Sequence, residues 1–366
     1  MTQETPLSQR IKKHIHVSGP LPLDQYMAMC LSDPSDGYYM TQNPFGTVGD
    51  FITAPEISQM FGEIIGLWAI DMWMKMGCPS PTTLIEIGPG RGTLMADILR
   101  ASRIAPEFME SVQIHLVETS PYLREIQMRT LATSDRVIEH HRSIANVPDG
   151  PSILIANEFF DALPVCQFEW VENRWKERCV DLDDAKFTIV LQEPEHLPGD
   201  MPKTRPQPGD ILEWSQARQS ECARIAQRCA QPGGAALIID YGHKESMFGD
   251  TLQAVSNHAP ASIFDQPGRC DLTSHVDFQA LGEIARTHGA LPYGPLEMGT
   301  FLLELGIGVR AQALKKNLDK EVALHIDTAL HRLTDPSEMG DLFKVLALTG
   351  PHLGTPAPFP HDKWPA

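Results

Sequence analysis

The chain has 366 residues, of which 42% are hydrophobic and 21% charged, as expected of a globular protein with a large core. Its formal net charge of −17 disfavours a nucleic-acid-binding surface, which needs clustered lysine and arginine. The seven cysteines form no C-x-x-C pair and the histidines no H-E-x-x-H pattern, so neither a disulfide framework nor a metal site is predicted.

The first 80 residues are predicted to form a helical region and a lid. Apolar spacing predicts helices over 20–33 and 57–77. The connection GDFITAPEIS (49–58) is a candidate lid over cofactor or substrate, although its polar side chains could simply cap the next helix. Its three candidate residues are Asp50, Thr53 and Glu56.

Residues 84–100 read LIEIGPGRGTLMADILR, which predicts a buried strand, a glycine turn and a helix. The dinucleotide fingerprint Gly-x-Gly-x-x-Gly is not met, because Thr93 holds its third glycine position, and no P-loop lysine follows. The order Glu-x-Gly-x-Gly-x-Gly instead resembles motif I of class I S-adenosylmethionine methyltransferases. That resemblance implies a cofactor-binding turn formed by Glu86, Gly88, Gly90 and Gly92.

The next predicted strand, QIHLVET (113–119), contains Glu118 near its end. An acid at this place in a nucleotide-binding fold accepts hydrogen bonds from ribose hydroxyls, so Glu118 is a candidate cofactor ligand. The alternative is a surface glutamate before the predicted helix 121–132.

His140 and His141, which are adjacent in sequence, are interpreted as surface residues that point in different directions.

Strands near 83–87, 113–118, 152–156 and 235–240 alternate with helices, which predicts an α/β fold. Between the last two strands, residues 165–192 predict a hairpin with a turn at Glu172-Asn173, and a charged helix over 214–230 follows. Together with this alternation, the resemblance to motif I implies a class I methyltransferase (Rossmann-like) fold, with a mostly parallel sheet, a helical N-terminal region and an inserted β-rich cap. The expected division is an N-terminal region at 1–80, a core at 81–164 and 231–350, a substrate-recognition insertion at 165–230, and a proline-rich tail at 351–366.

Several further stretches resemble the MidA-like family of class I methyltransferases, which is related to a mitochondrial protein arginine methyltransferase of respiratory complex I assembly. They are GDFITAPEIS, IEIGPGRGTL, ANEFFDALPV (156–165), IDYG (239–242), DLTSHVDF (271–278) and MGDLFKVLAL (339–348). The resemblance implies S-adenosylmethionine as cofactor and a protein substrate, with a complex I subunit as a candidate partner. It also places Asn157, Glu158 and Asp161 in the acidic segment that faces cofactor and substrate.

Arginine methylation needs carboxylates, because a guanidinium remains protonated at physiological pH and must be held so that one nitrogen can attack. Glu158 and Asp161 are three residues apart and would share one face if a helix began there. The alternative is that one of them caps that helix. His275 is a candidate for proton removal, or for a structural role. Asp240 and Tyr241 end a core strand at the edge expected for substrate.

The leading hypothesis is a protein arginine methyltransferase. Two alternatives remain: a non-catalytic assembly factor that binds the cofactor and docks a partner, and a small-molecule N-methyltransferase. No apolar run reaches the length of a membrane span, and no signal or clear transit peptide is evident in the sequence. A cytoplasmic, bacterial-type protein is therefore expected, while the oligomeric state is left open.

Overall fold

The computed structural model describes residues 4–41, 53–199, 201–256, 258–316 and 318–360. Its largest sheet has the strand order β15-β16-β10-β5-β2-β3-β4, with β14 beside β10. The inner strands are parallel, and β16 runs antiparallel to both of its neighbours, which confirms the predicted mostly parallel α/β sheet. The strands are β2 (Thr82–Ile87), β3 (Val112–Val117), β4 (Ile138–His141), β5 (Ser152–Asn157), β10 (Gly234–His243), β14 (Val276–Asp277), β15 (Leu291–Glu297) and β16 (Phe343–Thr349).

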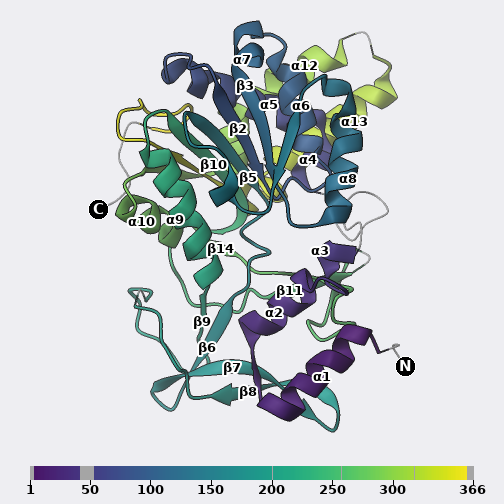
Figure 1. The fold of residues 1–366 in the computed structure, drawn as a ribbon, viewed down its shortest axis with the longest axis vertical. Coiled ribbons are helices and arrows are strands. Elements are labelled where there is room, and N and C mark those ends of the chain that lie inside the picture. Colours follow the sequence, from purple (N-terminus) through teal and green to yellow (C-terminus); the bar gives the residue numbers. More distant parts are fainter. Residues whose placement is uncertain (1–3, 42–52, 200, 257, 317, 361–366) are drawn as a thin grey trace.

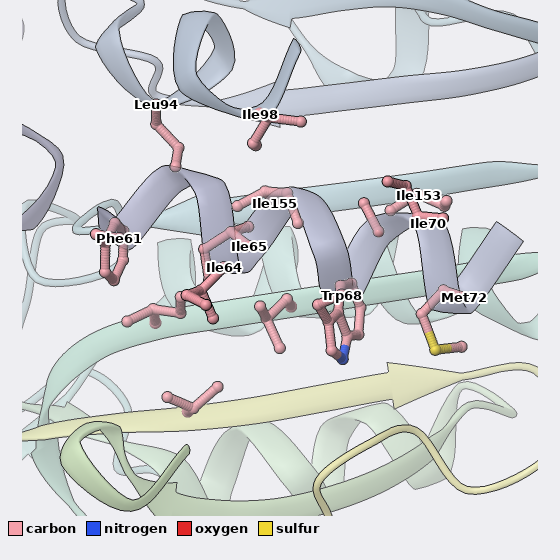
Figure 2. Close-up of a cluster of buried hydrophobic side chains, with 14 of the residues drawn as sticks. Phe61, Ile64, Ile65, Trp68, Ile70, Met72, Leu94, Ile98, Ile153 and Ile155 are labelled. Carbon is pink, nitrogen blue, oxygen red and sulfur yellow. The ribbon is translucent and has the colours of Figure 1, made fainter. Parts of the chain in front are cut away.

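Alternate residues of the strands enter two separate hydrophobic clusters, one on each face of the sheet. Leu84 faces the cluster that contains α5, whereas Ile85 faces the cluster that contains α9 and α10. Figure 2 shows Ile65 of α5 beside Ile155 of β5, and Ile70 of α5 beside Ile153. The helices on the α5 face are α4 (Ala54–Ile57), α5 (Gln59–Lys75), α6 (Thr93–Ser102), α7 (Pro106–Ser111), α11 (Met298–Glu304), α12 (Ile307–Lys315), α13 (Lys320–Thr334) and α14 (Met339–Leu342). Those on the opposite face are α9 (Gln216–Ala230) and α10 (Phe278–Thr287).

The predicted helix 57–77 begins differently in the structure. Ser58 has an extended backbone and separates α4 from α5, and its hydroxyl accepts the N–H of Met60 at 3.2 Å. A residue that caps the second helix cannot also continue the first one. The predicted helix 121–132 is α8 (Pro121–Thr130), followed by a 3-10 turn at Leu131–Ser134.

A second group of elements lies below the large sheet in Figure 1 and has its own hydrophobic cluster. It joins the N-terminal helices to a five-stranded antiparallel sheet and a three-stranded sheet. The predicted hairpin is confirmed: Glu172 and Asn173 have φ of 53° and 62°, which suits a tight two-residue turn. The elements are α1 (Pro6–Ser18), β1 (Leu21–Pro22), α2 (Leu23–Ser32), α3 (Tyr38–Thr41), β6 (Cys166–Val171), β7 (Arg174–Asp183), β8 (Lys186–Gln192), β9 (Ile211–Trp214), β11 (Gln253–Ser256), β12 (Ala259–Ala261) and β13 (Asp271–Thr273).

Side-chain packing groups the chain differently from the sequence-based division. Within residues 1–80, α1 and α2 pack with the small sheets, whereas α5 packs on the large sheet. Within 165–230, the strands belong to the small sheets, but α9 covers the large one. The division of the chain into a lid, a core and a substrate-recognition insertion remains a prediction. No helix within the described residues combines the length and apolar character needed to cross a membrane.

One buried cation ties these two groups together. The guanidinium of Arg218, on α9, donates to the carbonyl oxygens of Phe160 (2.8 Å), Asp161 (3.2 Å), Ser274 (2.9 Å) and His275 (2.8 Å). Its side chain thereby joins the segment after β5 to the segment that links β13 and β14. Backbone carbonyls that have been taken out of water depend on such donors.

We expect Arg218→Met to lower the free energy of unfolding by about 3 kcal/mol or more, because several buried carbonyls lose their donor. Urea denaturation followed by circular dichroism measures this loss. Arg224→Met, on an exposed position of the same helix, is the control and should change stability little. An Arg218→Met protein as stable as the control would show that the carbonyls find other partners.

Candidate active site

The glycine turn after β2 takes a backbone form that only glycine adopts easily. Gly88, Gly90 and Gly92 have φ of 66°, 50° and 81°. Gly88 and Gly90 line a cavity of about 530 Å³, whereas Gly92 is the N-cap residue that precedes α6. A Cβ on Gly88 would lie 3.0 Å from the ring of Phe159, so the turn also depends on close packing.

Glu86 lies at the end of β2 and is buried, with 2% of its surface exposed. Its Oε2 atom has no hydrogen-bond partner among the described residues. Burial raises the pKa of this carboxyl to about 8, and the nearby charge of Asp97 adds to the rise. The side chain lines a small pocket beside the glycine turn, so a ligand with an ammonium group would supply the partner it lacks.

Glu118 directly follows β3, the strand beside β2, and lines the large cavity. Its Oε1 accepts the N–H of Ser120 at 2.8 Å. The amide of Gln127 donates both to its Oε2 (3.3 Å) and to the carbonyl of Gly90 (2.8 Å), and thereby connects the acid to the glycine turn. His140, which is partly buried, contacts Gln127 Oε1 at 2.9 Å and belongs to this network.

His141 is partly buried as well and points to another strand. Its Nε2 lies 2.9 Å from Nδ1 of the buried His115, and Glu139 Oε2 lies 3.8 Å from the same Nδ1. The ligand atoms of these three side chains lie within 4.8 Å of one another, a grouping that the search for sequence motifs missed because two strands contribute to it. A distance of 2.9 Å between ring nitrogens is that of a hydrogen bond, so one imidazole can donate to the other without an ion.

The segment after β5 is a turn around a buried carboxylate, and the expected helix is absent. Asp240 Oδ2 accepts the N–H groups of Phe159 (3.2 Å), Phe160 (2.9 Å) and Asp161 (3.2 Å), and Oδ1 accepts that of Tyr241 (3.0 Å). Residues 158–161 lie in no helix, so neither acid caps one there. Burial, followed by the charges of Asp161 and Glu158, raises the pKa of Asp240 well above its usual range.

Both predicted catalytic acids face the large cavity. Glu158 has φ of 49°, and its Oε1 accepts the N–H of Ala54 (2.9 Å) and the amide of Asn157 (3.1 Å). Burial raises the pKa of Glu158 to about 7. Burial also raises the pKa of Asp161, and a hydrogen bond from Tyr241 opposes that rise.

Most of the other residues predicted to bind cofactor or substrate line one of the two pockets or lie directly behind the wall. Thr53 and Glu56 line the small pocket with Asn157, and Glu56 Oε1 accepts the hydroxyl of Thr93 at 2.7 Å. Tyr241 lines the large cavity, and Asp240 lies beneath its wall. Asp50 lies outside the described residues.

The structure does not bring His275 to the cavity wall. Its backbone N–H donates to Thr251, and its ring packs edge-on against Tyr241 at 5.5 Å between centroids. Burial lowers the pKa of its imidazole. A catalytic role for His275 therefore remains a prediction without a geometric argument.

The sequence analysis missed several polar side chains that line the cavity, among them four from α3, β13 and α13. Tyr39 comes from α3, Asp271 and Thr273 from β13, and Arg332 from α13. Asp271 and Thr273 lie in the stretch DLTSHVDF, which was noted for its family resemblance only. Spacing along the chain gave no reason to place β13 beside the turn after β5.

The chain is similar over most of its length to proteins that are named as methyltransferases. Residues 64–296 match the family described as "Putative S-adenosyl-L-methionine-dependent methyltransferase". The mitochondrial "Protein arginine methyltransferase NDUFAF7 homolog" of Drosophila melanogaster is 37% identical over 93% of this chain and 84% of the relative. Human mitochondrial "Protein arginine methyltransferase NDUFAF7" is 35% identical over 95% and 84%.

A crystal structure from Burkholderia thailandensis, described as a likely methyl transferase bound to S-adenosyl-homocysteine, superposes with a TM-score of 0.82. It is 26% identical and covers 95% of this chain and 92% of that one. The prediction of a cytoplasmic location is contradicted by the names of the curated relatives, which are mitochondrial proteins. The chain belongs to the family of S-adenosylmethionine-dependent methyltransferases that includes the NDUFAF7 proteins.

Proposed function

We propose that this methyltransferase acts on the guanidinium group of a protein arginine. The observation that carries the proposal is that Glu158 and Asp161 line the same cavity as Gly88, Gly90 and Glu118. A carboxylate pair thus faces the turn proposed to bind the cofactor. The names of the curated relatives, which are protein arginine methyltransferases, support this choice of substrate.

We assign cofactor binding to the glycine turn and the acids on either side of it. Gly88 and Gly90 let the backbone approach a ligand, Glu118 can accept hydrogen bonds from ribose hydroxyls, and Glu86 can pair with an ammonium group. The buried Oε2 of Glu86 fits this assignment, because it lacks a partner among the described residues. When bound, S-adenosylmethionine supplies a sulfonium methyl group.

The acids can hold and orient the second reactant. A carboxylate binds a guanidinium through two parallel hydrogen bonds, which fixes the plane of the group and localises its charge. Methyl transfer then depends on alignment more than on covalent help from the protein. Glu158 is the residue for which we propose this role most directly, because it lines both the large cavity and the small pocket.

The cavity also has a wall from the second group of elements, namely α2, α3, β11 and β13. We propose that these elements, together with the inserted strands, recognise the protein substrate. The resemblance to a family linked with complex I assembly makes a complex I subunit our candidate substrate.

Cofactor binding should release protons near pH 7 through Glu86. A carboxyl with a pKa of about 8 is mostly protonated there, and a bound ammonium group lowers that pKa, so about one proton leaves per cofactor. Affinity should accordingly rise as the pH approaches 8. Calorimetry in two buffers with different ionisation enthalpies measures the release. Glu86→Gln is the control and should remove it; equal release by wild type and variant would exclude Glu86.

Glu158→Gln should keep cofactor affinity and lose methyl transfer by about two orders of magnitude or more, because the uncharged amide cannot pair with a guanidinium. In the wild type, the rate at low substrate concentration should rise with pH through about 7, as Glu158 becomes ionised. The assay follows labelled methyl groups from S-adenosylmethionine into proteins of a lysate from a strain that lacks the gene.

Glu283→Gln, which makes the same change on the exposed face of α10, is the matched control. Transfer at the wild-type rate by Glu158→Gln would exclude Glu158 as the clamp. Loss of cofactor binding in this variant would place Glu158 in the cofactor site instead. A wild-type protein that binds the cofactor but labels nothing would favour a docking factor.

A further inference from the structure

Asp271 and Tyr39 form a polar pair on the cavity wall supplied by the second group of elements. Asp271, on β13, is 5% exposed, and Tyr39, on α3, donates its hydroxyl to Asp271 Oδ1 at 2.8 Å. Both side chains line the large cavity. This hydroxyl bond restrains one oxygen of the Asp271 carboxylate.

Asp161 lies close to the same pair. Burial raises the pKa of Tyr39 well above its usual range, and the charges of Asp271 and Asp161 raise it further. The pKa of Tyr241 is raised in the same way, by burial, by Asp161 and also by Asp271. Two carboxylates and two phenol rings, from four different segments of the chain, are therefore gathered around one part of the cavity.

The charges on the cavity wall call for a cation in this part of the site. Ionised carboxylates removed from water are costly unless a positive group joins them. Within the described residues, acids outnumber cations on the lining: Glu118, Glu158, Asp161, Glu221 and Asp271 against Arg142 and Arg332.

A guanidinium fits this arrangement better than an ammonium group does. It is planar, presents paired donors to carboxylates on two edges, and stacks on aromatic rings. A lysine ammonium is a compact point charge that cannot match two carboxylate planes at once.

We propose that Asp271, oriented by Tyr39, acts with Asp161 as the part of the site that selects a guanidinium over an ammonium group. This inference rests on the proposed arginine methyltransferase function. It assigns specificity to a residue outside the methyltransferase sheet. The complete site then needs residues from β13, from α3 and from the turn after β5.

The test uses two probes, each an adenosine whose ribose carries a short tether in place of the sulfonium chain. One tether ends in a guanidine and the other in a primary amine. Calorimetry on the full chain measures the dissociation constants of both probes and of S-adenosylhomocysteine. The wild type should bind the guanidine probe about tenfold or more tightly than the amine probe, a difference of ~1.4 kcal/mol.

Asp271→Asn should reduce that preference to near unity while S-adenosylhomocysteine affinity is retained. Tyr39→Phe should give a smaller loss in the same direction, and Asp271→Glu should restore part of the preference. Glu283→Gln is the control for removal of one negative charge. Tyr39→Phe also serves as the decisive variant if Asp271→Asn does not fold.

Two results would overturn the proposal in different ways. A wild type that does not distinguish the probes would contradict arginine as the substrate, and the role of Asp271 with it. A wild type that prefers guanidine, with the same preference in Asp271→Asn and Tyr39→Phe, would leave the arginine substrate in place and exclude Asp271 as its selector.

Discussion

The buried carboxylate of Asp240 is the constraint on which the site depends. A carboxyl group with 0% exposure needs hydrogen-bond partners in place of water, and here four backbone N–H groups donate to it. Three of them belong to residues 159–161, so the Asp240 side chain shapes the turn that carries Glu158 and Asp161. Glu158 itself takes a left-handed backbone form with φ of 49°.

The candidate site also depends on the contact between the two groups of elements. Arg218 extends from α9 and joins the segment after β5 to the segment after β13 through their carbonyl groups, and the N–H of Ser274 donates to the carbonyl of Asp161 between the same two segments. Gly88 and Glu118, for which we propose cofactor binding, come from the large sheet, whereas both groups of elements line the rest of the cavity.

The order of apolar, polar and glycine residues along the chain was sufficient to predict elements that neighbouring residues determine. Alternation of apolar runs and glycine turns located four core strands, and Glu172-Asn173 identified the hairpin turn. The same pattern did not predict the turn at residues 158–161, because Asp240, whose carboxyl group accepts their N–H groups, is about 80 residues away in sequence. Asp271 and Tyr39 could not be found either, since they meet the site only through tertiary packing. The contacts of His140 and His141 could not be predicted for the same reason, because their partners Gln127 and His115 lie on other elements.

The central claim, methyl transfer to arginine, is tested most directly by the chemical identity of the product. Proteins of a lysate without the endogenous enzyme would be labelled with purified chain and methyl-labelled S-adenosylmethionine, hydrolysed to amino acids, and separated. The account predicts that the label elutes with methylated arginine and that unlabelled S-adenosylhomocysteine suppresses it. Label in methyl-lysine, or in small molecules with none in protein, would contradict the account.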